Sequence, residues 1–96
     1  MILEHALLPV RPGSEAEFEA AFSTARLIIE ASPGFIRLTL ERGIESPSTY
    51  LLLVEWQTLD AHQVGFRESA AYQEWRAQLH HFDEPAPAVE HYRRIQ

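Results

Sequence analysis

Residues 50–56 constrain the fold more than any other part of this 96-residue chain. They read Tyr-Leu-Leu-Leu-Val-Glu-Trp, so a strand formed here would be apolar on both of its faces. A strand of that kind must be covered on both sides of its sheet. The chain therefore needs one layer of its own against the sheet and a second layer from elsewhere.

Three other segments have the character of strands. Apolar residues at strand spacing, with bounding turn residues, predict strands over residues 2–10, 35–42 and 88–95, in addition to the apolar strand, which we expect over residues 49–58. The two central strands are joined by a turn that contains Gly43 and Pro47, which predicts a hairpin with a generous loop.

Helices are predicted between the first two strands and before the last one. Ser14 and Glu17 match the capping-box pattern, and apolar residues at helical spacing follow, so we expect a helix over residues 14–31. A short helix is expected over residues 59–67. Ser69 is then expected to cap a longer helix.

The order of these elements predicts one α+β domain over residues 1–96. Strand, helix, strand, strand, helix, strand is the ferredoxin-like β-α-β-β-α-β arrangement, with an antiparallel four-stranded sheet. Its helices cover one sheet face only. A second copy of the chain would cover the other face with its own sheet, so we expect a homodimer.

Composition excludes several classes of partner and site. A net charge of −6 with no lysine repels phosphate groups, so neither nucleic acid nor an anionic membrane is an expected partner. The absence of cysteine removes thiol nucleophiles, iron–sulfur ligation and Cys-based zinc sites. Residues 1–5 lack the basic start of a signal peptide and no stretch is long enough to span a membrane, so we expect a cytoplasmic protein.

Several short motifs, in this order, resemble the antibiotic biosynthesis monooxygenase family. They are residues 51–56, Leu59-Asp60-Ala61-His62, Phe66-Arg67-Glu68-Ser69, Tyr72-Gln73-Glu74-Trp75, His81-Phe82 and Pro87-Ala88-Val89-Glu90-His91-Tyr92, with a Pro33-Gly34-Phe35 turn before them. The resemblance implies a dimeric α+β barrel. It also implies an oxygenase, because the characterised members are mostly cofactor-free oxygenases of polycyclic quinols or haem-degrading oxygenases.

No cofactor is expected. Haem-degrading members resemble one another in an Asn on the first strand and a Trp on the short helix, whereas this chain has no Asn and has Phe66 near the expected Trp. The four glycines are isolated, so no phosphate-binding loop for a flavin or nicotinamide is present. His80 and His81 lie near Asp83 and Glu84, but adjacent helical side chains diverge, so no metal site is expected.

A cavity between the sheet and the helices is the expected ligand site. A cofactor-free oxygenase must deprotonate a phenol or quinol so that the anion can pass an electron to dioxygen. Histidine suits that proton transfer because its pKa lies near neutrality. We expect His62 or His5 as the base and Arg76 as the stabiliser of the oxyanion. The aromatic residues expected to stack on a small aromatic substrate are Phe66, Tyr72 and Trp75.

Each of these residues also has a purely structural interpretation. Tyr72 and Trp75 at helical spacing are typical of core residues, His62 of a hydrogen-bonded imidazole, and Arg76 of a surface partner for a glutamate. His91 is interpreted in the same way, as a hydrogen-bonded imidazole that supports the sheet. Trp56 is interpreted as structural, either in the core or at the dimer interface.

Two functions follow from these interpretations. The first is a cofactor-independent monooxygenase of a small aromatic or quinol-type molecule. The alternative is a non-catalytic dimeric ligand-binding or stress-related module, in which Tyr72, Trp75 and Phe82 fill the space between sheet and helices.

Overall fold

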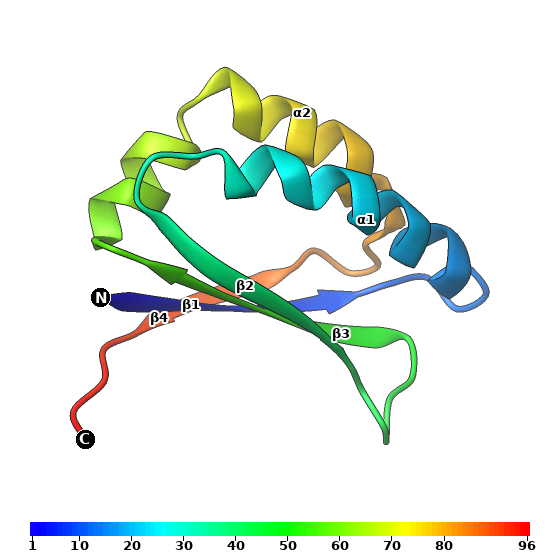
Figure 1. Ribbon diagram of the computed structural model, residues 1–96. Helices are drawn as coiled ribbons and strands as arrows, with labels where there is room; N and C mark the ends of the chain where they lie inside the picture. The colour runs from blue at the N-terminus through cyan, green and yellow to red at the C-terminus, as the bar shows by residue number, and fades with distance from the viewer.

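The computed structural model describes residues 1–96 and has the predicted β-α-β-β-α-β order (Figure 1). The strands and long helices are β1 (Ile2–Pro9), α1 (Glu15–Glu30), β2 (Phe35–Arg42), β3 (Thr49–Trp56), α2 (Ala70–Leu79) and β4 (Ala88–Tyr92). Two single turns flank α2: the π-helical turn η1 (Ala61–Phe66) and the 3₁₀ turn η2 (His80–Phe82). Strand order is β2-β3-β1-β4, and every neighbouring pair is antiparallel, which confirms the predicted α+β ferredoxin-like fold.

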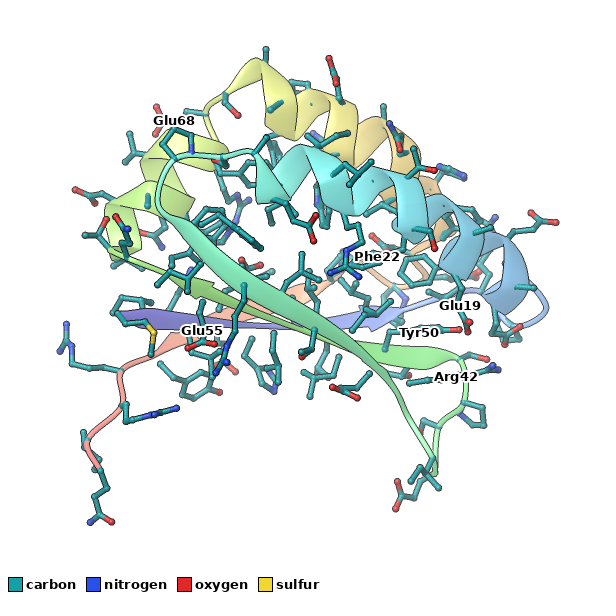
Figure 2. All side chains as sticks on the ribbon, in the orientation of Figure 1. Glu19, Phe22, Arg42, Tyr50, Glu55 and Glu68 are labelled. Carbon is teal, nitrogen blue, oxygen red and sulfur yellow. The ribbon has the colours of Figure 1, made fainter.

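Both long helices lie on the same face of the sheet, as Figure 1 shows. From α1, Phe18, Phe22 and Ile29 are buried against inward-facing residues of β3 such as Leu52 and Val54. Figure 2 shows Phe22 in the space between α1 and the sheet. None of the helices has the length and apolar character needed to cross a lipid bilayer.

No element covers the opposite face of the sheet (Figure 1). The residues of β1 and β3 that point to it are the alternate set of each strand, namely Leu3, His5, Leu7, Leu51, Leu53 and Glu55. Leu7 is 41% exposed, whereas its neighbour Leu8, on the helix side, is 8% exposed. This uncovered face is called the open sheet face below.

The structure corrects one predicted helix cap and confirms another. Ser14 precedes α1 but its side chain makes no capping hydrogen bond, since its backbone angles are φ −103° and ψ 9° rather than extended. Glu15 instead accepts the Gly13 backbone N–H, at 2.9 Å. Ser69 is extended and its Oγ accepts the Tyr72 backbone N–H at 3.1 Å, as predicted.

Strand ends also differ from prediction. β4 ends at Tyr92 rather than at residue 95, and β3 ends at Trp56 rather than at residue 58. In both cases the strand ends beside the start of its antiparallel neighbour β1, because Trp56 pairs with Ile2 and Tyr92 pairs with Leu3. Beyond β3, Gln57 donates its backbone N–H to the carbonyl oxygen of Gly34 at 2.8 Å instead of continuing the ladder with β1.

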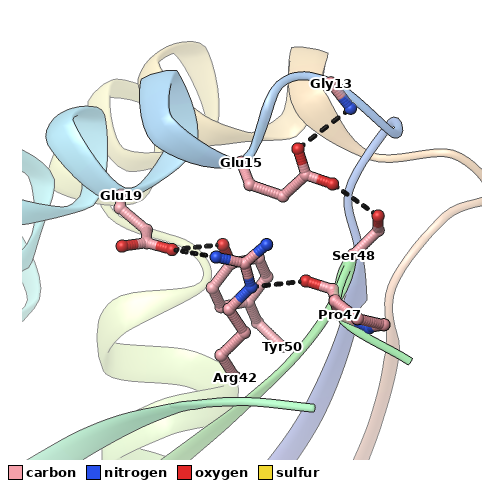
Figure 3. A network of polar contacts seen from close by, with 7 residues as sticks. All are labelled: Gly13, Glu15, Glu19, Arg42, Pro47, Ser48 and Tyr50. Atoms are coloured by element: carbon pink, nitrogen blue, oxygen red, sulfur yellow. Dashed lines mark hydrogen bonds and ion pairs between the residues drawn. The ribbon is translucent and has the colours of Figure 1, made fainter. Parts of the chain in front are cut away.

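Polar contacts tie the start of α1 to the β2–β3 hairpin (Figure 3). Glu19 accepts hydrogen bonds from the Tyr50 hydroxyl and, at 3.5 Å, from Arg42. Glu15 accepts another from the hydroxyl of Ser48. Burial, together with the hydrogen bond to Glu19, raises the pKa of Tyr50 to about 12, so this phenol stays protonated as a donor.

Candidate functional site

A cavity of about 330 Å³ lies between the helix-covered face of the sheet and α2. Its lining is mostly apolar. β1 contributes Glu4, Ala6 and Leu8, η1 contributes His62 and Phe66, and α2 contributes Tyr72, Trp75, Arg76 and Leu79. Small-molecule sites typically span roughly 300–1,000 Å³, so this cavity suits a small ligand.

The cavity contains a buried carboxyl–imidazole pair. Glu4 and His62 are only 5% and 3% exposed, and they are the two polar residues of the buried set. The Nε2 atom of His62 lies 3.3 Å from Glu4 Oε1, and the Trp56 indole donates to the same oxygen at 3.0 Å. On the other side of the ring, His62 Nδ1 lies 2.7 Å from His91 Nε2. Three strands and η1 thus supply one continuous chain of polar contacts.

Local structure explains why these side chains meet. On β1, Glu4 lies on the same face as Ala6 and Leu8, and β4 places His91 directly opposite Glu4 in the antiparallel register. The π-helical turn buries His62 and Phe66 on one side. The His62 ring stacks on Trp56, with centroids 5.2 Å apart and planes 20° apart, and this contact fixes its orientation.

Burial sets the charge of the pair. Desolvation raises the pKa of Glu4 to about 7, although the hydrogen bond from Trp56 and the charge of Arg67 oppose that rise. Desolvation, together with the charges of His91 and Arg67, lowers the pKa of His62 to about 4. Near neutral pH the imidazole of His62 is therefore neutral, and Glu4 exchanges its proton readily.

A second carboxyl lines the cavity, contributed by Asp83 on the segment between η2 and β4. Burial raises the pKa of Asp83 to about 6. Its Oδ2 atom is enclosed and has no hydrogen-bond partner. Asp83 is separated from Glu4 along β1, because its own backbone pairs with Val10 rather than with the start of the strand.

Five of the six residues predicted from the sequence line this cavity: His62, Phe66, Tyr72, Trp75 and Arg76. Trp75 is buried and contacts Phe22 and Phe66, so it serves the core as well. Arg76 is exposed, lines the cavity and takes part in no ion pair, which contradicts its interpretation as a surface partner of a glutamate.

His5 does not line the cavity. Strand alternation places it on the open sheet face, where its ring contacts Tyr92 edge-on with centroids 5.5 Å apart. The expectation that His5 faces the ligand is therefore corrected. Trp56 is fully buried on the helix side, in the core rather than on the open sheet face.

The sequence did not single out Glu4, which the structure buries in the lining of the cavity. The available signal was a carboxylate in the same alternating set as Ala6 and Leu8, an arrangement that places a charged group on an apolar face. His91 was interpreted as a hydrogen-bonded imidazole that supports the sheet, and its bond to His62 agrees with that interpretation.

Comparisons with known proteins place this architecture in a family. The sequence model described as "Antibiotic biosynthesis monooxygenase" matches residues 1–78. The chain is 47% identical to the uncharacterised protein YczJ of Bacillus subtilis (strain 168) over 95 residues, which cover 99% of this chain and all of YczJ.

Solved structures agree. A protein of Bordetella bronchiseptica, described as a putative antibiotic biosynthesis monooxygenase, is 40% identical with a TM-score of 0.95, over 99% of this chain and 97% of that one. SnoaB of Streptomyces nogalater, a cofactor-independent oxygenase, is 21% identical with a TM-score of 0.85, over 99% and 93% of the two chains, and shows the shared fold. By its sequence and its fold, this chain belongs to the antibiotic biosynthesis monooxygenase family.

Proposed function

We propose that the protein is a cofactor-independent monooxygenase of a small aromatic or quinol-type molecule bound in the cavity beside Glu4 and His62. The observation that carries this proposal is the buried carboxyl–imidazole pair in an aromatic-lined cavity. Such a pair is costly to bury and is well suited to taking a proton from a bound hydroxyl. Family membership supports the same reaction class.

The reaction requires only dioxygen as a second reactant. Removal of the hydroxyl proton from a quinol, or from the enol form of an anthrone-type substrate, leaves an anion whose charge is shared with a ring carbon. The anion transfers one electron to dioxygen, and the resulting radical pair joins to form a carbon–peroxide bond. Loss of water then leaves a carbonyl, so one oxygen atom enters the product and the other leaves in water.

The cavity residues have distinct tasks in this proposal. The Glu4–His62 pair takes the proton, and Arg76 stabilises the oxyanion that forms. Phe66, Tyr72 and Trp75 surround the aromatic rings of the substrate and exclude water from the radical pair.

The alternative of a non-catalytic module predicts that Tyr72, Trp75 and Phe82 fill the space between sheet and helices. A cavity of about 330 Å³ remains there, and its lining includes Tyr72 and Trp75 but not Phe82. This observation favours a ligand-binding interior over a closed core. It leaves catalysis to be tested directly.

We further propose that the active form is a cytoplasmic homodimer joined through the open sheet face. Leu7 of β1 is 41% exposed there, and Leu51 and Leu53 of the neighbouring β3 are covered by no element of this chain. Burial of this apolar surface by a second copy would supply the missing layer.

Oxygen uptake tests the proposed activity. Metal-free protein is incubated with a panel of anthrones and hydroquinones, and dissolved oxygen is followed against heat-denatured protein. We expect uptake above the denatured control with at least one substrate. Uptake equal to the control throughout the panel would count against an oxygenase and favour the non-catalytic alternative.

A further inference from the structure

We infer that Glu4 is the catalytic residue that accepts the proton of a bound aromatic hydroxyl, and that His62 and His91 relay this proton toward solvent. The inference deepens the proposed function and rests on it for the identity of the substrate class. The inferred base is thus Glu4, with two histidines behind it, whereas the sequence suggested a single histidine as the base.

The geometry excludes His62 as the group that contacts the ligand proton. His62 Nδ1 is hydrogen-bonded to His91 Nε2 at 2.7 Å, and His62 Nε2 faces Glu4 Oε1 at 3.3 Å, within ion-pair distance. A ligand hydroxyl would have to displace His91 or the Glu4 carboxyl to reach either nitrogen in the ring plane. His62 is therefore placed to pass a proton on rather than to receive it from a substrate.

Glu4 has the free acceptor. Its Oε1 atom is held by the Trp56 indole and by His62. Its Oε2 atom takes part in none of the side-chain hydrogen bonds, and it is not among the enclosed unpartnered atoms, of which Asp83 Oδ2 is the sole case. Because Glu4 lines the cavity, this second oxygen is available to a ligand hydroxyl there. Trp56 and His62 hold the carboxyl in place through Oε1.

The proton transfer balances without any further reactant. The ligand O–H bond breaks, its electron pair stays on oxygen as a phenolate, and the proton bonds to Glu4. In the relay step, the carboxyl turns its O–H bond toward His62, whose own proton is on Nδ1. The carboxyl proton moves to His62 Nε2 while the Nδ1 proton moves to His91 Nε2. Glu4 is then a carboxylate again, and His91 carries the positive charge until it releases a proton to water. His62 changes tautomer but never becomes charged, which agrees with its pKa of about 4.

His91 provides the exit. It lies on the edge strand β4 and is only partly buried, so its ring can lose the proton to water. The charged and titratable groups that face Glu4 are His62 from η1, Arg67 just after it, and His91 from β4. Glu4 itself has a pKa of about 7, which suits exchange with phenols of similar acidity.

The direct test uses 4-nitrophenol, which binds as a phenol but does not react with oxygen, and whose anion has a distinct visible absorption band. Near neutral pH we expect the bound ligand to contain a larger share of anion than free 4-nitrophenol does in the same buffer. Glu4→Gln should bind it with at least a tenfold smaller ratio of anion to neutral phenol. Glu68→Gln, which removes an exposed carboxylate close to the same end of the molecule (Figure 2), should behave as wild type.

An infrared difference spectrum provides a second readout that needs no change at Glu4. Binding of 4-nitrophenol to wild type should add the carbonyl band of a protonated carboxylic acid. Asp83 is the other carboxyl that lines the cavity, so Asp83→Asn shows which carboxyl gives the band. If Glu4 accepts the proton, the band should persist in this variant. Its disappearance in Asp83→Asn would overturn the inference, as would wild type that fails to bind or to ionise the phenol.

Failure of the inference and failure of the proposed oxygenase are distinguishable. Ionisation of 4-nitrophenol that depends on Glu4, without oxygen uptake on any substrate, would support the proton acceptor and reject the oxygenase. Oxygen uptake by Glu4→Gln at the wild-type rate, with an unchanged pH profile, would support the oxygenase and reject Glu4 as its base.

Discussion

Two glutamates on neighbouring strands point to opposite faces of the sheet. Glu55 of β3 pairs with Leu3 of β1 across the ladder, points to the open sheet face and forms an ion pair with Arg37. Glu4 is one residue further along β1, points to the helices and is 5% exposed with no ion-paired arginine. One residue of strand register thus separates an ion-paired carboxylate on the open sheet face from a buried carboxyl that reaches the cavity.

Burial of Glu4 makes stability depend on pH. Because its pKa rises from 4.5 unfolded to about 7 folded, the folded state holds the proton more tightly, and stability falls as pH rises from 4.5 through 7. Above pH 7 the ionised group costs about 3 kcal/mol. Glu4→Gln removes this cost, so its free energy of unfolding should exceed that of wild type at alkaline pH, and the difference should vanish below pH 4.5.

Urea unfolding of both proteins across the pH range measures this difference. His62 also makes stability depend on pH, with the opposite sign, because its pKa is lowered in the folded state. His62 is present in both proteins, so its effect cancels when the variant is compared with wild type. A difference in unfolding free energy that does not change with pH would mean that Glu4 is not buried as a titrating carboxyl.

The sequence predicted the cavity residues of the helices correctly, but it predicted the wrong residue of β1. Helical spacing assigned Tyr72, Trp75 and Arg76 to one face, and all three line the cavity. On β1 both alternating sets contain apolar residues, so alternation separates His5 from Glu4 without showing which of them points inward. That choice depends on which face the helices cover, a tertiary feature that a strand pattern does not contain.

Among the elements, η1 is the one on which the site depends most. The sequence predicted a helix over residues 59–67, but no pattern indicated its π geometry, which buries both His62 and Phe66. The loop between α1 and β2 packs closely against the first residue of η1: a Cβ added at Gly34 would lie 2.5 Å from the Cβ of Ala61. Gly34 also has φ +86°, a conformation that side chains rarely adopt.

Gly34→Ala should therefore destabilise the protein more than Gly13→Ala. Both positions have positive φ, which costs about 1 kcal/mol for alanine, but a Cβ at Gly13 meets nothing within 4 Å. The additional loss of stability in Gly34→Ala, relative to Gly13→Ala, measures the steric conflict with Ala61, which is next to His62. Thermal unfolding of the two variants measures it, and equal losses would show that the loop does not support η1.

The two helix starts provide a second comparison between elements. Ser69 caps α2 through a hydrogen bond from Tyr72, whereas the Ser14 side chain caps nothing, although the sequence predicted a cap at both. Ser69→Ala should cost about 1 kcal/mol of unfolding free energy. Ser14→Ala should cost much less, and a similar loss in both variants, measured by chemical denaturation, would contradict the difference between the caps.

At the scale of the whole molecule, the proposed dimer rests on the uncovered sheet face. The apolar character of β3 predicted a partner layer from sequence, and the helices do cover one face only, as Figure 1 shows. The proposed dimer would place Leu53 at its centre, between β1 and β2.

Leu53→Asp should therefore convert a dimer into a monomer at micromolar concentration, because it would bury a charge between two sheets. Leu27→Asp is the matched control, since Leu27 is 63% exposed on α1, and it should leave the mass unchanged. Light scattering after size exclusion gives the masses. A monomeric wild type would remove the dimer from the proposal.

The most direct test of the central claim is the fate of dioxygen in the cavity. Wild-type, metal-free protein is supplied with ¹⁸O₂ and the best anthrone-type substrate, and the product is analysed by mass spectrometry. We predict one ¹⁸O atom in each product molecule, with the second recovered in water, and loss of this labelling in Glu4→Gln. Product oxygen that derives from solvent, or labelling equal to that with denatured protein, would contradict a monooxygenase at this site.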